Sequence, residues 1–373
     1  MVRGSQGQPS VNKPQRLAFV VSTNVVILIV LLIAVEWGYR QLRPTTVGPE
    51  LAMAISHPTR VWSYKPNYET RFASEEFSIA IRTNSRGLRS AETLDGDITV
   101  LAIGDSFTFG WGVDEDDRFS DVFAREIEKR SRGKRVSVIN AGHWMYTFDQ
   151  QLLILGELLE RQNPDLVIHG WYWPHAYTLL GHQWQTRQEE LISISVPGLV
   201  LTPQGALRFQ SSVVASPLFG SRVLAEISRH WLNYRLVSTT TKSELDLLDD
   251  SNPTAQEAWA RTRAILDQTS EMVRRAGVAY IPFGIPRDSD VSREEWETWE
   301  VDQLERSDLG LPDRRLARWS EEFGVDYVEM TSAYRDRYTP KLYFQRDGHW
   351  NVAGHALAAE ILAEVALPKI SPH

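Results

Sequence analysis

Apolar runs of strand length alternate with segments of helical periodicity from residue 97 to the C-terminal region. The predicted strands lie at 98–103, 135–141, 165–169, 278–283 and 325–330. The predicted helices lie at 118–130, 149–162, 253–276, 312–323 and 351–365. Strands that alternate with helices are typical of a parallel sheet that helices cover on both faces. The pattern therefore predicts an α/β domain over residues 97–366.

Two segments depart from this alternation. Residues 61–96 hold short alternating stretches, such as 77–83, and then a turn signal at 84–87, so they predict a small β-rich lead-in. Residues 176–252 lack a clear strand–helix unit and contain several turn signals, so we predict an insertion in the α/β domain. Insertions of this kind often cover the carboxyl ends of the strands, where ligands bind.

The N-terminal region is apolar over a length that fits a membrane. Residues 17–35 carry no charge, and at ~1.5 Å per helical residue they cover most of a hydrocarbon core of roughly 30 Å. A cleaved signal peptide is one alternative, but no small-residue cleavage pattern follows the segment. A buried core helix is the other alternative. We predict a transmembrane helix at 17–36, between a cytoplasmic N-terminus at 1–16 and a juxtamembrane linker at 37–60.

The charges on either side of this segment indicate its orientation. Arg3, Lys13 and Arg16 precede it without any acidic residue, whereas Arg40 and Arg43 follow it in a stretch that also holds acids. Basic residues favour the cytoplasmic side of a membrane. We therefore predict a single-pass protein that is anchored in a lipid bilayer through residues 17–36. Its large domain would lie in the periplasm or outside the cell.

The composition excludes several classes of function. The formal net charge is -8 and no long basic run occurs, which argues against a nucleic-acid partner. The chain has no cysteine, so disulfides, thiolate catalysis and cysteine-bound metals are excluded. Its apolar and charged fractions are those of an ordinary globular protein with a packed core. Nothing in the sequence indicates the oligomeric state.

Residues with catalytic potential follow the predicted strands. Gly104-Asp105-Ser106 comes after the first strand, and Asp347-Gly348-His349 comes just before the last helix. Taken alone, a serine or an aspartate before a helix is most often a cap. Together they supply a hydroxyl, a base for its proton and a carboxylate that fixes the tautomer of the base. Since the ends of parallel strands meet at one edge of a sheet, these groups can face one another.

Three segments resemble the SGNH, or GDSL-type, hydrolases, over roughly residues 75–366. These segments are GDSFTFGWGV at 104–113, NAG at 140–142 and DGHWNVAGH at 347–355. The resemblance implies a flavodoxin-like three-layer sandwich. It also implies that Ser106 is the nucleophile, His349 the general base and Asp347 its orienting partner. The implied reaction is hydrolysis or transfer of an ester, frequently an acetyl group on a carbohydrate, with no metal or organic cofactor.

Two positions differ from the pattern of that family at the site that stabilises the oxyanion. Met145 stands where a glycine usually follows the second strand, and Pro174 stands where an asparagine side chain is usual. A proline offers no donor, and losing one oxyanion donor typically costs ~3 kcal/mol of transition-state stabilisation. The Met145 backbone N–H is the simplest replacement. The side chains of Asn140 and His175 are the alternatives.

The motif segments are rich in tryptophan. Trp144 and Trp173 stand among five tryptophans in or beside them, together with Trp111, Trp171 and Trp350. They either form a stacking platform for sugar rings or fill the core. His169 and His355 are interpreted as core histidines. The consecutive acids at 114–117 are interpreted as a solvated turn, because four neighbours in sequence cannot all face one ion.

The sequence therefore predicts a membrane-anchored ester hydrolase or O-acyltransferase with an acyl-serine intermediate. Its substrate would be an acylated glycan or a small ester at the cell envelope. One alternative is a catalytically weak envelope protein of the same fold that binds or positions a polysaccharide. A structural membrane protein with a vestigial fold is a third possibility. Hydrolysis and transfer use the same triad, so the sequence does not separate them.

Overall fold

The computed structural model describes residues 13–42, 53–131, 133–195, 199–201, 207–209, 246–292, 308–337 and 342–370. Helix α1 (Lys13–Leu42) belongs to a separate unit of the chain. The remaining elements belong to one unit, which comprises Val47–Gln210 and Ser238–His373. This unit holds all the predicted catalytic residues.

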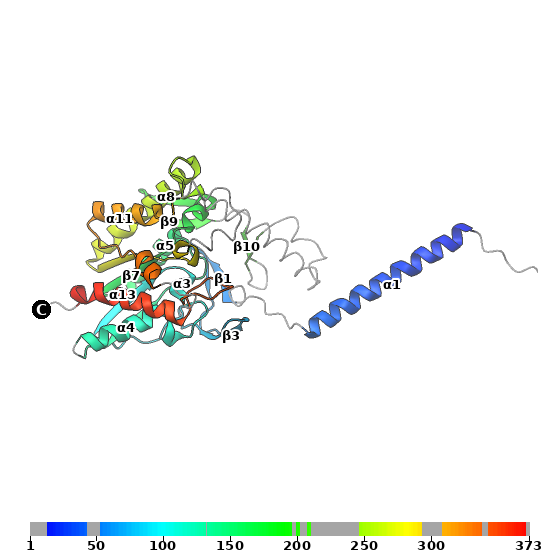
Figure 1. Cartoon of the computed structure of the whole chain (residues 1–373), viewed down its shortest axis with the longest axis horizontal. Coiled ribbons are helices and arrows are strands. Elements are labelled where there is room, and N and C mark those ends of the chain that lie inside the picture. The colour runs from blue at the N-terminus through cyan, green and yellow to red at the C-terminus, as the bar shows by residue number, and fades with distance from the viewer. Residues whose placement is uncertain are drawn as a thin grey trace, which may run out of the picture. The chain divides into compact units, whose positions relative to one another are not determined.

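A four-stranded parallel sheet forms the centre of this unit (Figure 1). Its strands are β5 (Ile98–Ile103), β6 (Val136–Asn140), β7 (Leu166–Trp171) and β12 (Ala279–Gly284), in the spatial order β12-β7-β5-β6. All three neighbouring pairs are parallel. The predicted α/β fold with a parallel sheet is therefore confirmed, and its strand order matches the first four strands of a flavodoxin-like sheet.

The predicted fifth strand is wrong. Residues 325–330 contribute a single parallel bridge, between Val328 and Phe283. The flanking residues already have other partners, because Val325 N–H closes the turn after α11 (Leu311–Phe323) and Glu329 caps the helix that follows.

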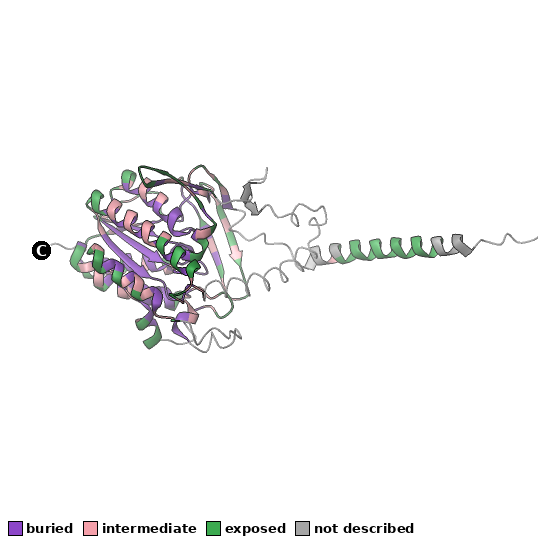
Figure 2. Cartoon of the chain, turned by 90° about the horizontal axis from the view of Figure 1, so that it is seen from above, coloured by how far each residue is buried: buried purple, intermediate pink, exposed green. Residues whose placement is uncertain are grey.

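Helices cover both faces of the sheet. Alternate residues of β5 point to opposite faces, as in any strand. Val100 and Ala102 pack in a cluster with α4 (Phe119–Arg130) and α13 (Val352–Ile370). Leu101 and Ile103 pack in a second cluster with α5 (Phe148–Gln162) and α8 (Pro253–Ala276). Figure 2 shows the strands buried between these more exposed helical layers.

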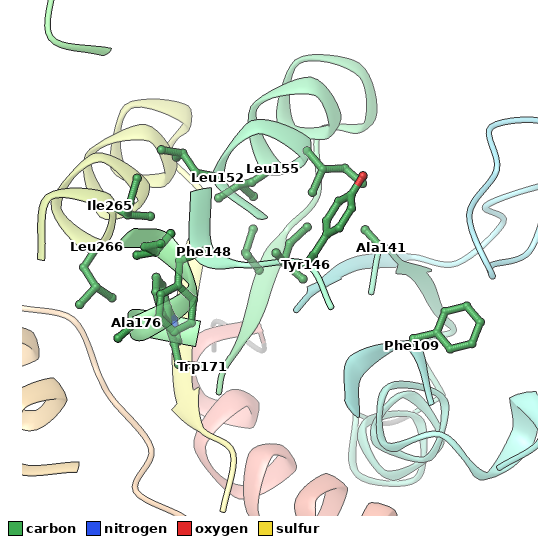
Figure 3. Close-up of a cluster of buried hydrophobic side chains, with 14 of the residues drawn as sticks. Phe109, Ala141, Tyr146, Phe148, Leu152, Leu155, Trp171, Ala176, Ile265 and Leu266 are labelled. Atoms are coloured by element: carbon green, nitrogen blue, oxygen red, sulfur yellow. The ribbon is translucent and has the colours of Figure 1, made fainter. Parts of the chain in front are cut away.

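The second cluster is drawn in Figure 3. Leu152 and Leu155 of α5 face Ile265 and Leu266 of α8, and Trp171 lies at the end of β7. Leu155 and Ile265 are fully buried. Truncating a side chain of this kind to alanine costs about 2–5 kcal/mol, because lost burial and the cavity add together.

Local sequence explains where the longest helix of this unit begins and ends. The Asn252 side chain accepts a hydrogen bond from Thr254 N–H, and Pro253 occupies the first helical position of α8. Gly277 ends the helix in the left-handed conformation, with φ of 68°. The predicted bounds of α8 and of β5 are both confirmed.

The described strands of the lead-in and of the insertion pair as short hairpins. Before the sheet, β1 (Ala54–His57) pairs with β2 (Val61–Tyr64), and β3 (Glu69–Ala73) pairs with β4 (Ser78–Arg82), both antiparallel. In the insertion, α6 (His175–Thr178) precedes the pairs β8 (Gln183–Arg187) with β9 (Glu190–Ser195) and β10 (Leu199–Leu201) with β11 (Leu207–Phe209). Residues 210–245 of the predicted insertion lie outside the described residues.

The remaining short elements connect these parts. They are α3 (Ser106–Phe109), α9 (Asp288–Val291), α12 (Thr331–Asp336) and the 3-10 turns at Glu115–Asp117 and Leu179–Gly181. The acids at 114–117 form one of these turns, and Asp114 accepts a hydrogen bond from Ala80 N–H. His169 and His355 are fully buried, as predicted for core histidines.

Helix α1 covers the segment that was predicted to cross a membrane. Within the described ranges, no helix meets the length and apolarity that a membrane crossing requires. The span at 17–36 and the orientation that follows from it stay predictions. Residues 1–12 and 43–52, which hold most of the predicted cytoplasmic N-terminus and part of the predicted linker, lie outside the described residues.

Candidate active site

Ser106 lies directly beyond the carboxyl end of β5. The strand ends at Ile103, and Asp105 then caps α3 by accepting a hydrogen bond from Phe107 N–H at 3.0 Å. Ser106 is the first residue of that helix. The strand order reverses between β5 and β7, so Ser106 occupies the point where open α/β sheets bind ligands.

Two glycines allow the chain to pack closely around Ser106. A Cβ atom on Gly104 would lie 2.0 Å from Thr108 Oγ1. A Cβ atom on Gly142 would lie 2.2 Å from the backbone nitrogen of Phe109. A side chain at Gly142 would therefore push the loop after β6 away from α3, and one at Gly104 would collide with Thr108 of α3 itself.

Ser106, His349 and Asp347 form a continuous hydrogen-bonded chain. His349 Nε2 lies 2.8 Å from Ser106 Oγ, and His349 Nδ1 lies 2.6 Å from Asp347 Oδ1. With the proton on Nδ1, the neutral imidazole donates to the carboxylate and accepts from the hydroxyl. The structure thus brings together the three residues that the sequence predicted, although 243 positions separate Ser106 from His349.

Asp347 is held by donors on both carboxylate oxygens. Trp111 Nε1–H donates to Oδ2 at 3.0 Å, while the His349 ring and the His349 backbone N–H contact Oδ1. Burial by itself would raise the pKa of Asp347. The hydrogen bond and charge of His349, together with the Trp111 bond, outweigh burial and lower the pKa below its usual value. Asp347 is therefore ionised at neutral pH, as a partner for an imidazolium must be.

The loop after β6 leaves one backbone donor without a partner. Its other N–H groups are engaged, because Ala141, Gly142, His143, Trp144 and Tyr146 all donate within the unit.

Among the residues that the structure describes, Met145 N–H makes no hydrogen bond. Ser106 N–H, at the first position of α3, has no partner within its helix. That these two N–H groups together bind an oxyanion stays a prediction.

Met145 adopts the backbone conformation that a glycine would prefer. Its φ is 56°, in the left-handed region, and its side chain is 53% exposed. This conformation costs a residue with a Cβ roughly 1–2 kcal/mol. Methionine therefore preserves the loop shape expected of a glycine at this position, together with its backbone N–H.

Asn140 and His175, the alternative donors, have other partners. Asn140 Nδ2 donates to Thr108 O at 2.6 Å and to Ser120 Oγ at 3.0 Å, so the amide ties the loop after β6 to α3 and α4. His175 Nε2 lies 3.1 Å from Asp105 Oδ2. His175 thus supports the residue that caps α3. Pro174 precedes the short helix α6.

Four of the five tryptophans near the motifs are buried, as the core interpretation expects. They are Trp111, Trp171, Trp173 and Trp350, each at most 6% exposed. Trp173 donates its Nε1–H to Asp290, and the Arg287 guanidinium lies 4.3 Å from the centre of its ring. Trp144 is half-buried, and its backbone N–H donates to the Tyr64 hydroxyl at 2.8 Å. Trp144 therefore remains the candidate for contact with a ligand.

Sequence reasoning missed the residues that hold the loop of Met145 in place. His143 is fully buried and stacks between the rings of Tyr64 and Tyr146, at centroid distances of 4.6 Å and 4.3 Å. Burial, reinforced by the nearby Arg60 charge, lowers the pKa of His143 to about 3, so the ring is neutral. The sequence around His143 does not reveal this role, because Tyr64, one of the two rings that stack on it, comes from β2.

Sequence reasoning also missed Arg89, because its hydrogen-bond partners come from a different segment of the chain. Its guanidinium is fully buried and donates to the carbonyls of Phe109, Gly110 and Val113, which form the turn after α3. Burial and the neighbouring Arg118 lower the pKa of Arg89 to about 9, so it remains charged at neutral pH. Arg89 thereby fixes the turn that carries Trp111.

A cavity of about 320 Å³ lies between α8 and α11 and includes none of the three triad residues. Three of its arginines, Arg263, Arg314 and Arg315, are paired with carboxylates. Within the described part of the chain, no cluster of three or more histidines and acids could hold a metal ion.

Comparison with known proteins gives one family match. Residues 241–372 match the family model described as ALGX, the SGNH hydrolase-like domain of the acetyltransferase AlgX. The matched range contains Asp347 and His349, while Ser106 lies outside it. No curated protein sequence matches the chain.

Several solved structures are similar to the chain at low identity. A lipase/acylhydrolase from Enterococcus faecalis is 14% identical with a TM-score of 0.40, over 74% of this chain and 98% of that one. The acetyl xylan esterase AlAXEase is 11% identical with a TM-score of 0.41, over 72% and 99%. A catalytic mutant of the acetylxylan esterase Axe2 from Geobacillus stearothermophilus is 14% identical with a TM-score of 0.41, over 72% and 94%.

Proposed function

We propose that the chain is a serine ester hydrolase or O-acyltransferase that works through an acyl group on Ser106. The observation that carries the proposal is the unbroken contact from Asp347 through His349 to Ser106 Oγ. Such an arrangement activates a hydroxyl that is otherwise a weak nucleophile at neutral pH. The family match is consistent with acyl transfer, since its name is that of an acetyltransferase.

The first half of the reaction transfers the acyl group to the enzyme. Ser106 Oγ attacks the ester carbonyl carbon while its proton passes to His349 Nε2. The carbonyl oxygen becomes an oxyanion that accepts hydrogen bonds from Ser106 N–H and Met145 N–H. The intermediate then collapses and breaks the bond to the leaving alcohol, which takes the proton from His349. Asp347 stabilises the imidazolium in between.

The second half removes the acyl group by the same steps in reverse. Water or the hydroxyl of a sugar gives its proton to His349 and attacks the acyl carbon on Ser106. The products are a carboxylic acid in the first case and a new ester in the second. Trp144, which is half-buried and adjacent to Met145, is the candidate for stacking on a sugar ring, so we take an acylated glycan as the candidate substrate.

Labelling with a fluorophosphonate probe tests the proposal. The full chain should acquire one covalent adduct on Ser106, which peptide mass spectrometry would locate, and Ser106→Ala should acquire none. His349→Ala should slow labelling at least as strongly as Asp347→Asn, because His349 itself takes the proton from Ser106, whereas Asp347 only orients His349. The absence of any adduct on wild-type Ser106 would favour the alternative, a catalytically weak protein that binds a polysaccharide.

Hydrolysis and transfer are separated by a second measurement. The chain is supplied with an acetyl ester, with and without an unacetylated oligosaccharide. Acetate release that is independent of the oligosaccharide indicates a hydrolase. Acetylated oligosaccharide, detected by mass spectrometry, indicates a transferase.

A further inference from the structure

The turn between β3 and β4 contacts the loop that carries Asp347. Glu76 in this turn accepts hydrogen bonds from Arg346 N–H, at 3.1 Å to both of its carboxylate oxygens, and from Asp347 N–H at 3.0 Å. Two successive backbone N–H groups that point at one carboxylate form an anion-binding nest. The occupant of this nest comes from the lead-in, 271 positions before Asp347.

The position of Glu76 is itself determined by a tight turn. Ser74 N–H donates to Phe77 O, and the Ser74 hydroxyl accepts hydrogen bonds from the N–H groups of Glu76 and Phe77. The Phe77 ring then packs against Phe344 at a centroid distance of 4.9 Å and against Trp111 at 6.1 Å. The turn is thus fixed against both the nucleophile segment and the loop of Asp347.

Glu76 completes the set of contacts around the triad acid. Trp111 holds Asp347 Oδ2, His349 contacts Oδ1, and Glu76 holds the Asp347 backbone nitrogen. The loop between Phe344 and His349 is closed by two backbone hydrogen bonds of 2.9 Å, from Phe344 N–H to His349 O and from Gly348 N–H to Phe344 O, so the Asp347 N–H held by Glu76 lies between fixed points. Without an anion in the nest, the adjacent N–H groups would turn toward water and the Asp347 side chain would move with them.

We propose that Glu76 is a positioning residue for the triad acid and acts through the backbone of Asp347. This inference rests on the proposed function of the triad. Glu76 reaches neither substrate nor Ser106. It fixes the carboxylate that orients His349, so the lead-in is part of the catalytic apparatus of the α/β domain.

The neighbouring residue provides a matched control. Glu75 pairs with the Arg346 side chain, and both side chains are 73% exposed. An exposed pair of this kind contributes little to stability. Glu75→Gln and Glu76→Gln therefore remove the same charge from adjacent positions, but the second alone alters an acceptor of the Asp347 N–H.

The experiment uses the full chain and two readouts. The first is the rate of fluorophosphonate labelling of Ser106. The second is the NMR resonance of the Nδ1 proton that His349 shares with Asp347, which reports on their contact even when no acyl transfer occurs. We expect Glu76→Gln to slow labelling at least tenfold and to shift or broaden this resonance. Glu75→Gln should leave the rate within twofold and the resonance unchanged.

Each outcome decides the matter. Wild-type behaviour of Glu76→Gln in both readouts overturns the inference, as does slower labelling with an unchanged resonance, which would indicate a role away from Asp347. If wild-type Ser106 fails to label at all, the proposed function fails and the resonance alone decides whether Glu76 positions Asp347. Thermal unfolding of each variant separates these effects from loss of the fold. If Glu76→Gln does not fold, Glu76→Asp replaces it, since its shorter side chain keeps the charge but loses reach to the nest.

Discussion

Trp111 and Asp347 are joined by a hydrogen bond of 3.0 Å from the indole N–H to the carboxylate, although 236 positions separate them in the chain. Trp111 itself is fixed by its backbone N–H, which donates to Ser106 O at 3.0 Å. The indole therefore connects the nucleophile segment to the triad acid by a route that does not pass through His349.

The hydrogen bond from Trp111 to Asp347 predicts a smaller loss of activity when the indole is removed than when the carboxylate is removed. Trp111→Phe removes one donor that lowers the pKa of Asp347, so the pKa of this carboxyl should rise, as NMR titration would show. We expect the labelling rate of Ser106 at neutral pH to fall about tenfold. Asp347→Asn should cost on the order of 10⁴, because an amide favours the wrong tautomer of His349. A Trp111→Phe variant with an unchanged labelling rate would contradict this role.

Met145 predicts a contrast between two substitutions at one position. Met145→Gly keeps the N–H and relieves the left-handed backbone, so its labelling rate should stay within about threefold of wild type. Met145→Pro removes the N–H but also forces φ to about -65°, so the expected loss of about 10²–10³ in rate supports the donor role only if the loop keeps its packing. Near-UV circular dichroism shows whether the proline variant keeps the packing of its loop. Equal rates for the two variants would exclude Met145 N–H as an oxyanion donor.

Three buried histidines predict a loss of stability in acid. Burial lowers the pKa of His143, His169 and His355 to about 3 in the folded chain. The unfolded chain binds more protons between pH 3 and about 6.5, so the free energy of unfolding must rise with pH across this window and level off above it. Urea denaturation at a series of pH values measures this slope.

His355 is the histidine best suited to test that assignment. Its Nδ1 accepts a hydrogen bond from Phe119 N–H, a contact that the side-chain oxygen of glutamine can reproduce. In His355→Gln, the slope of unfolding free energy against pH should fall by up to about 1.4 kcal/mol per pH unit. An unchanged slope would mean that folding does not lower the pKa of His355.

The predicted anchor at 17–36 has a direct test. The apolar side chains of α1 from Phe19 to Val35 are exposed, for example Leu32 at 60%. We expect the full chain to remain in the membrane pellet after alkaline carbonate extraction. Replacing Val30 and Leu31 by arginine should move it to the supernatant, because charges at mid-helix oppose insertion. Recovery of the wild-type chain in the supernatant would contradict the predicted anchor.

Periodicity predicted the sheet well because its strands are long and buried. The bounds of β5 and α8 agree with the prediction, since a turn or cap residue flanks each of them. The segment at 325–330 also carries apolar residues, but only Val328 pairs with the sheet. A hydrophobic pattern shows which residues can be buried. Strand pairing also requires backbone N–H and C=O groups that the neighbouring turns do not already use.

The triad was predictable, but the residues that hold it were not. Ser106, Asp347 and His349 stand out because their chemistry is unusual at the ends of strands. Asn140 also stands out, yet its amide serves Thr108 and Ser120 instead of a ligand. Glu76 gives no signal in the sequence, because a glutamate in a hairpin turn reads as solvated. Its role depends on a contact that only the folded chain brings about.

The distance along the chain between Ser106 and His349 has a consequence for synthesis. The ribosome completes the serine, its cap and the surrounding strand long before it reaches the histidine, and translation at about 5–20 residues per second makes this interval roughly ten seconds or more. During that time Ser106 has no base within reach, so its hydroxyl is chemically ordinary. On the proposed mechanism, the nascent polypeptide would gain an activated Ser106 only once the loop of His349 has formed, and a chain interrupted before residue 349 should not react with esters.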